Sequence, residues 1–118
     1  MLKYGEPPYL ECSTKGDKRF SAFCAKIKQY ENKSIEQLYQ AFKVFTNGET
    51  GLHWRQAKGR CAVNQKDASV YYATLWDIYI KENPELLIVL KNSSGLSDIF
   101  GKEGSCCQTT ELWRIRNA

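Results

Sequence analysis

The sequence is poor in the residues that bind metal ions. It has one histidine, and none of its five cysteines is part of a CxxC pair. Because a structural zinc ion needs four ligands in paired spacing, the sequence predicts no metal site. We expect the cysteines to be reduced and to pack as small hydrophobic residues. No organic cofactor is indicated either.

Long hydrophobic runs are also missing. The longest, LLIVL at 86–90, is far too short to cross a bilayer, and the N-terminal MLKYGEPPYL contains no apolar run of signal-peptide length. We therefore expect a cytoplasmic protein without a membrane partner.

Blocks of like charge are absent as well. Seventeen Lys and Arg against thirteen Asp and Glu give a net charge of +4, and the charges are interspersed along the chain. A basic nucleic-acid-binding tail is therefore not indicated, although the positive balance favours anionic partners.

Common catalytic signatures do not occur. The chain has no GxSxG elbow, no Walker loop and no GxGxxG. The single His53 stands beside Trp54 with no identifiable partner, so we interpret it as a surface or hinge residue rather than a general base.

The composition is that of one folded domain. At 118 residues, with 42% hydrophobic residues and no linker or repeat, the chain suits a single domain spanning 1–118. Near the N-terminus, PYLECS and RFSAFCAKI flank a KGD turn, a pattern typical of a β-hairpin. The rest is mainly helical, so we expect a small α+β domain.

Four helices are predicted from apolar spacing and capping residues. The first starts at a capping box of Ser34 and Gln37 and extends to about Phe45. The second covers about 67–82, and the third follows Asn83 as its cap, with Pro at its first position. A second capping box, Ser105 with Gln108, predicts a terminal helix.

The first helix, in SIEQLYQAFK, carries a polar row. Glu36, Gln40 and Lys43 fall at i, i+4 and i+7 on one face. Such a row is most often a solvated surface, but it can also form the floor of a binding site.

Two segments place basic residues next to aromatic ones. GDKRFSAF contains Arg19 and Phe20, and HWRQAKGR contains Trp54, Lys58 and Arg60. Arg presents a planar fork that suits phosphate, and an aromatic face suits a planar ring, so together they fit a phosphorylated nucleoside. Basic surface loops are the alternative interpretation of each segment.

The order of these segments resembles the NADAR domain. Members of that family carry a phrase like LSNF followed by S-V-E-H-x-Y-Q-A-x-K. The residues that match it here are Ser34, Glu36, Tyr39, Gln40, Ala41 and Lys43. Weaker similarities follow in order, at AKGR (57–60), ENPELLIVL (82–90), SDIFG (97–101) and LWRIR (112–116), so the resemblance extends from Arg19 to Arg116.

Three positions depart from the family pattern. Ala22 stands in place of an Asn, Gln37 in place of a His, and Cys106 in place of a second Asn. The family uses these positions in its pocket, so the substrate differs or catalysis is lost.

The resemblance implies a NADAR-like fold and an N-glycosidase, with an ADP-ribose-like or phosphoribosyl molecule, or ADP-ribosylated guanine, as substrate. Nucleic acid would then enter as the carrier of the modification. Glu36 would stabilise positive charge on the sugar or activate water, Lys43 would contact phosphate or ribose or act as a nucleophile, and Gln40 would hold ribose hydroxyls. By analogy alone, the setting would be phage or bacterial defence and counter-defence.

The substrate-binding residues expected under this reading are Arg19, Phe20, Gln40, Trp54, Lys58 and Arg60. Two alternatives stay open. The chain can be a non-catalytic module that sequesters a nucleotide or inhibits a protein, or a sequence-independent nucleic-acid binder with a steep salt dependence.

Overall fold

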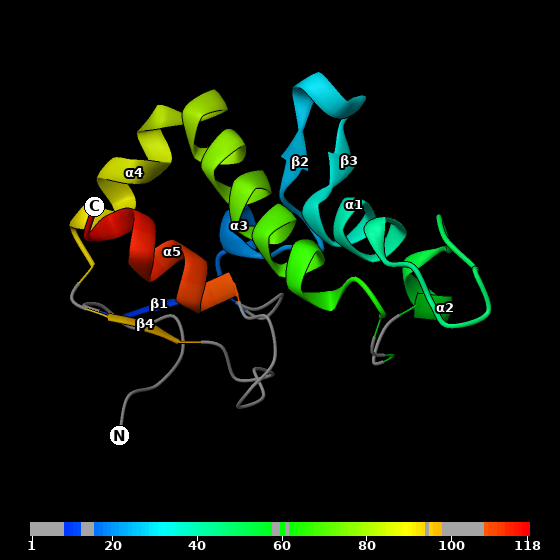
Figure 1. Cartoon of the computed structure of the whole chain (residues 1–118). Helices are drawn as coiled ribbons and strands as arrows, with labels where there is room; N and C mark the ends of the chain where they lie inside the picture. Colours follow the sequence, from blue (N-terminus) through cyan, green and yellow to red (C-terminus); the bar gives the residue numbers. More distant parts are fainter. Residues whose placement is uncertain (1–8, 13–15, 58–59, 61, 94, 98–107) are drawn as a thin grey trace.

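The computed structural model describes residues 9–12, 16–57, 60, 62–93, 95–97 and 108–118. Its helices are α1 (Ile35–Phe42), α2 (Trp54–Ala57), α3 (Gln65–Glu82), α4 (Pro84–Lys91) and α5 (Gln108–Arg116). Figure 1 shows α3 running through the middle of the molecule, with α1 on one side and both α4 and α5 on the other. The short α2 lies beyond α1.

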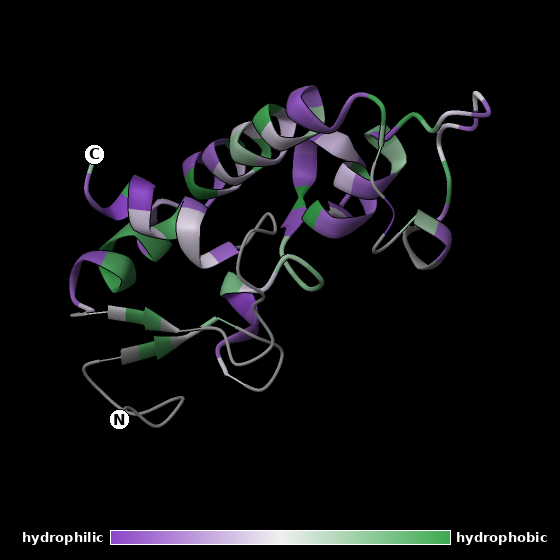
Figure 2. Ribbon diagram, turned by 60° about the horizontal axis from the view of Figure 1, so that its bottom comes forward, coloured by the Kyte–Doolittle hydropathy of each residue, from purple (hydrophilic) through white to green (hydrophobic). Residues whose placement is uncertain are grey.

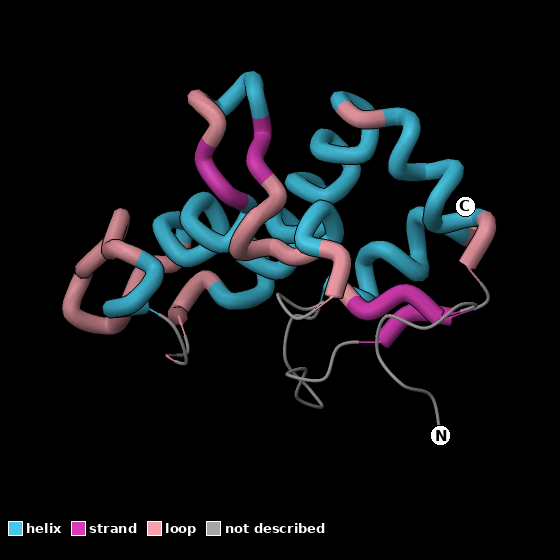
Figure 3. The backbone as a smooth tube through the Cα atoms, turned by 180° about the vertical axis from the view of Figure 1, so that it is seen from behind, coloured by secondary structure: helices cyan, strands magenta, loops and turns pink. Residues whose placement is uncertain are grey.

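Two pairs of short strands accompany the helices. β2 (Lys26–Ile27) pairs antiparallel with β3 (Lys33–Ser34), while β1 (Tyr9–Glu11) pairs parallel with β4 (Gly95–Ser97), in the register Tyr9 to Gly95. Seen from behind, β2 and β3 lie next to α1, and β1 and β4 lie near the C-terminal helix (Figure 3). The expected fold class, a mainly helical α+β domain with a short N-terminal hairpin, is confirmed.

Only the end of the expected RFSAFCAKI strand, Lys26–Ile27, takes part in the hairpin, and its partner is Lys33–Ser34 rather than PYLECS. Tyr9–Glu11 pairs with the distant β4. Arg19 and Phe20, expected to begin the second strand, lie in a 3-10 turn formed by Lys18–Phe20. The Asp17 carboxylate caps this turn by accepting from the Arg19 N–H at 3.1 Å. An Asp that satisfies the backbone locally competes with strand pairing, which explains the difference.

The capping box of α1 is confirmed. The Ser34 hydroxyl accepts from the Gln37 N–H at 3.1 Å, and the Gln37 side chain accepts from the Ser34 N–H at 2.9 Å. The helix, however, ends at Phe42, three residues before the expected end. Lys43 is extended there, because the next N–H, that of Val44, donates to the Asn64 side chain.

The long helix α3 is confirmed and begins two residues before the expected start. Pro84 occupies the first turn of α4 as expected, but Asn83 does not cap α4 with its side chain. Its Nδ2 instead donates to the Tyr79 carbonyl at 2.9 Å and closes the end of α3. Of the predicted terminal capping box, Ser105 lies outside the described residues, and Gln108 is the first residue of α5.

The main core surrounds α3 and is rich in aromatic residues. Figure 2 shows hydrophobic and hydrophilic bands alternating along α3, as expected for a helix that buries one face. The fully buried residues of this core include Phe20, Leu75, Trp76 and Leu112. A second, small cluster of Phe45, Ala57 and Ala62 lies around α2. Within the described ranges, no helix combines the length and apolar character that a membrane span requires.

Candidate functional site

Glu36 and Gln40 form a buried polar pair on α1. They expose 9% and 4% of their surface, and the Gln40 Nε2 donates to the Glu36 Oε1 at 2.8 Å. Residues four apart face each other across one helical turn, which explains the contact. The polar row is therefore not a solvated helix face.

Tertiary contacts place the Glu36 end of α1. The Ile35 N–H donates to the Ala25 carbonyl at 2.9 Å, and the Glu36 N–H donates to the Ala22 carbonyl at 3.0 Å. These bonds satisfy N–H groups that a helix start leaves open. A carboxylate in this first turn is also favoured by the helix dipole.

The Gln40 amide retains an unused acceptor. Its Oε1 is buried and has no hydrogen-bond partner among the described residues. Reversing the amide would place this oxygen against the Glu36 carboxylate, so the carboxylate sets the orientation. A buried carbonyl oxygen without a donor is costly, and a hydroxyl or N–H group of a ligand would satisfy it.

Lys43 is buried just after α1. It exposes 4% of its surface, its Nζ donates to the Arg60 carbonyl at 3.2 Å, and it lies 5.0 Å from the centre of the Tyr39 ring. A cation at the C-terminal end of a helix is favoured by the dipole, as the Glu36 carboxylate is at the other end.

Arg60 meets Lys43 through its backbone and keeps its side chain near solvent. The guanidinium carbon lies 4.0 Å from the centre of the Phe45 ring, and its Nη1 lies 4.0 Å from the Glu49 carboxylate. With 43% of the side chain exposed, this planar fork can still meet a phosphate.

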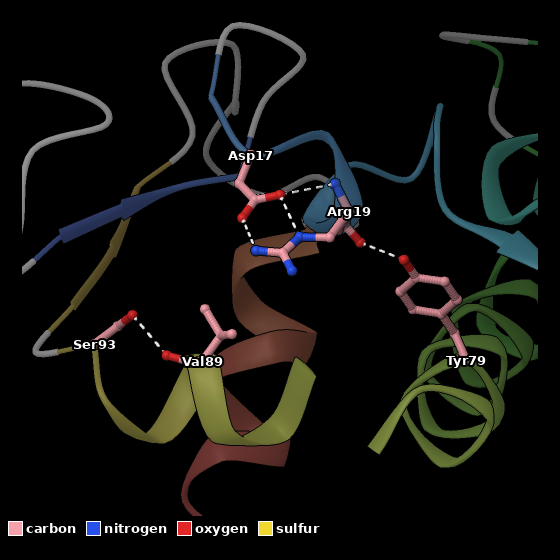
Figure 4. A network of polar contacts seen from close by, with 5 residues as sticks. All are labelled: Asp17, Arg19, Tyr79, Val89 and Ser93. Carbon is pink, nitrogen blue, oxygen red and sulfur yellow. Dashed lines mark hydrogen bonds and ion pairs between the residues drawn. The ribbon is translucent and has the colours of Figure 1, made fainter. Parts of the chain in front are cut away.

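Arg19 has a different environment. Its Nε and Nη2 donate to the two oxygens of Asp17, at 3.0 and 2.7 Å, and its carbonyl accepts from the Tyr79 hydroxyl (Figure 4). The hydrogen bond from Arg19 lowers the pKa of Asp17 and the same bond raises the pKa of Arg19. Because Asp17 fills the guanidinium fork, phosphate would have to displace a carboxylate.

The two basic segments do not form one cluster. Arg19 contacts Tyr79 near the end of α3, whereas Arg60 precedes the start of that helix at Gln65. Fourteen residues of helix span about 21 Å. The structure thus joins Glu36 to Gln40 and Lys43 to the Arg60 backbone, and it leaves Arg19 apart from Arg60.

The remaining residues that the sequence singled out lie in different environments, and one of them is outside the described residues. Phe20 is fully buried in the main core, so its ring presents no surface to a ligand. Trp54 begins α2, and Lys58 lies outside the described residues. His53 is exposed, as expected of a surface residue.

Cysteine placement is mixed. Cys12 is buried in the core as expected, but Cys24 is exposed, and neither is in a disulfide. Cys61, Cys106 and Cys107 lie outside the described residues. In the described part of the chain, no three His, Cys, Asp or Glu side chains come together as a metal site.

Sequence reasoning missed two residues that organise the site. Gln108 contacts the segment that holds Glu36, and Asn64 closes the chain on both sides of Lys43. Both contacts are between residues far apart in sequence. Gln108 was singled out only as the capping partner of Ser105, and Asn64 belongs to no motif or periodic pattern. Local patterns do not indicate contacts over such separations, so the role of each residue followed only from the tertiary structure.

The sequence and the structure were compared with those of known proteins, and no similar protein was found. No protein-family model, curated protein or solved structure matches this chain.

Proposed function

We propose that this protein binds an ADP-ribose-like or phosphoribosyl nucleotide beside Glu36 and hydrolyses its N-glycosidic bond. The observation that carries the proposal is the buried Glu36–Gln40 pair with its unused Gln40 acceptor. The choice of substrate rests on the resemblance of SIEQLYQAFK to the NADAR phrase.

The reaction asks for a carboxylate close to the sugar. As the bond between the anomeric carbon and the base nitrogen breaks, positive charge develops on the ring, and water then adds to that carbon. Glu36 would stabilise the charge or take the proton of the water, and the departing nitrogen would end up protonated. The Gln40 Oε1 would accept a hydrogen bond from a ribose hydroxyl.

The cationic residues would hold the phosphates. The exposed fork of Arg60 suits a phosphate directly. Lys43 would act as a fixed positive charge rather than a nucleophile, since its ammonium already donates to the Arg60 carbonyl. Trp54 and Lys58 stay as predicted contacts, and Arg19 and Phe20 have no role in this proposal.

A second candidate function is a binding module without catalysis. The burial of Glu36 and the engagement of Lys43 favour it, because a buried carboxylate reaches water only if neighbouring groups move. This version would sequester the nucleotide rather than cleave it.

The two candidates separate in one experiment. The protein is incubated with ADP-ribosylated guanosine, ADP-ribose and related nucleotides. Mass spectrometry detects the released base, or the released guanosine for the first substrate, while calorimetry measures binding. We expect release by the wild type and a loss on the order of 100-fold with Glu36→Gln.

The matched control is Glu85→Gln. Glu85 also lies in the first turn of a helix, in α4, but it is exposed. Both changes remove a carboxylate near a helix N-terminus, so a difference between them reports on the site. Binding without base release would establish the binding module. The absence of both binding and release would reject both candidates.

A further inference from the structure

We infer that Gln108 is a positioning residue for Glu36, acting through the backbone of Ala22. This rests on the proposed function for the role of Glu36, but the structural coupling between the two residues can be tested without it. Gln108 lies 72 positions after Glu36 in the sequence and belongs to the helix at the other end of the chain.

Gln108 makes two short, buried hydrogen bonds. Its Oε1 accepts from the Ala22 N–H at 2.7 Å, and its Nε2 donates to the Cys12 carbonyl at 2.7 Å. The residue exposes only 7% of its surface. One amide therefore ties the start of α5 to two separate stretches of the N-terminal region.

The bond to Ala22 leads directly to the candidate site. The Ala22 N–H is held by Gln108, and the carbonyl of the same residue accepts from the Glu36 N–H at 3.0 Å. A shift of Ala22 would therefore move the acceptor that orients the first turn of α1. This turn carries the Glu36 carboxylate.

The chemistry of the position is restrictive. It needs one acceptor and one donor on the same planar group, which a glutamine amide provides. An ionised glutamate offers only acceptors and would repel the Cys12 carbonyl, whereas a protonated glutamic acid offers one of each. Methionine has a similar size and can make neither bond.

The first test follows the backbone and needs no substrate. Amide hydrogen exchange is compared in the wild type, Gln108→Met and the control Thr110→Met, an exposed position on the same helix. We expect the Glu36 amide to exchange at least tenfold faster in Gln108→Met, with the α3 amide of Leu75 changed less. Equal acceleration of both amides would mean a general loss of stability and would overturn the inference.

The second test uses the reaction. With Gln108→Met we expect kcat to fall on the order of 100-fold and KM to change little, because a displaced carboxylate affects the transition state more than binding. Gln108→Glu is measured relative to wild type at pH 5 and pH 8. Protonation should restore part of its activity at pH 5, and an unchanged ratio would contradict the proposed hydrogen-bond requirement.

The two tests separate the inference from the proposed function. If the wild type releases no base but the Glu36 amide responds to Gln108→Met, the coupling stands and the hydrolase proposal falls. If base is released and Gln108→Met retains full kcat, the hydrolase stands and the positioning role is rejected.

Discussion

Asn64 should contribute more to stability than its half-buried position indicates. Its Oδ1 accepts from the Val44 N–H at 2.8 Å, and its Nδ2 donates to the Phe42 carbonyl at 3.0 Å. It joins the end of α1 to the start of α3. Asn64→Ala removes both bonds, while the cap of α3 is unaffected because the Asn64 side chain makes no cap hydrogen bond.

The expected loss follows from these two bonds. A typical hydrogen bond contributes about 1 kcal/mol, so Asn64→Ala should lower the free energy of unfolding by about 2 kcal/mol. The unfolding entropy of a 118-residue chain is about 250 cal/mol/K at the usual value per residue. The melting temperature should therefore fall by about 8 °C.

Thermal and urea unfolding monitored by circular dichroism measure both quantities. The control is Asn92→Ala, which truncates an exposed asparagine at the end of α4. If Asn64→Ala costs no more than this control, the reasoning about the link between the helices is refuted. Because Asn64 holds the backbone on either side of Lys43, the variant should also weaken nucleotide binding.

Two further predictions concern pH. Burial raises the pKa of Tyr79 to about 12, so the unfolded chain loses this proton first and stability falls as pH rises from about 10 to about 12. Urea unfolding should show the stability difference between wild type and Tyr79→Phe shrinking from pH 8 to pH 11, and a constant difference would contradict this. The hydrogen bond from Arg19 lowers the pKa of Asp17. The pair therefore stabilises the fold above pH 3.8, and this stabilisation is lost as pH falls through the lowered pKa. An NMR titration should give Asp17 a pKa below 3.8 in the wild type and a higher pKa in Arg19→Gln. Equal pKa values in the two proteins would disprove the pairing.

Local signals predicted much of the helical structure. The Ser34–Gln37 capping box and the proline at the start of α4 depend on neighbouring residues, which a sequence displays directly. The expected pairing of PYLECS with RFSAFCAKI was wrong because the partner of β1 comes from residues 95–97. The alternation of residues does not say which strand supplies the hydrogen bonds.

The candidate site was predicted in part. Helical spacing placed Glu36 beside Gln40, and their contact follows from that spacing. The predicted role of Arg19 as a substrate contact depended on how the N-terminal turn packs against α3. In the structure, the Arg19 guanidinium binds the Asp17 carboxylate instead. Whether these residues bind and cleave a nucleotide stays a prediction.

The sequence by itself determined where α1 starts and that Glu36 and Gln40 share a face, because capping and helical periodicity act over four residues or fewer. Tertiary structure decided that this face is buried, that Lys43 turns to the Arg60 carbonyl, and that Gln108 secures Ala22 from 86 positions away. These outcomes depend on which distant surfaces meet as the apolar residues leave water, and a periodic pattern does not specify that choice.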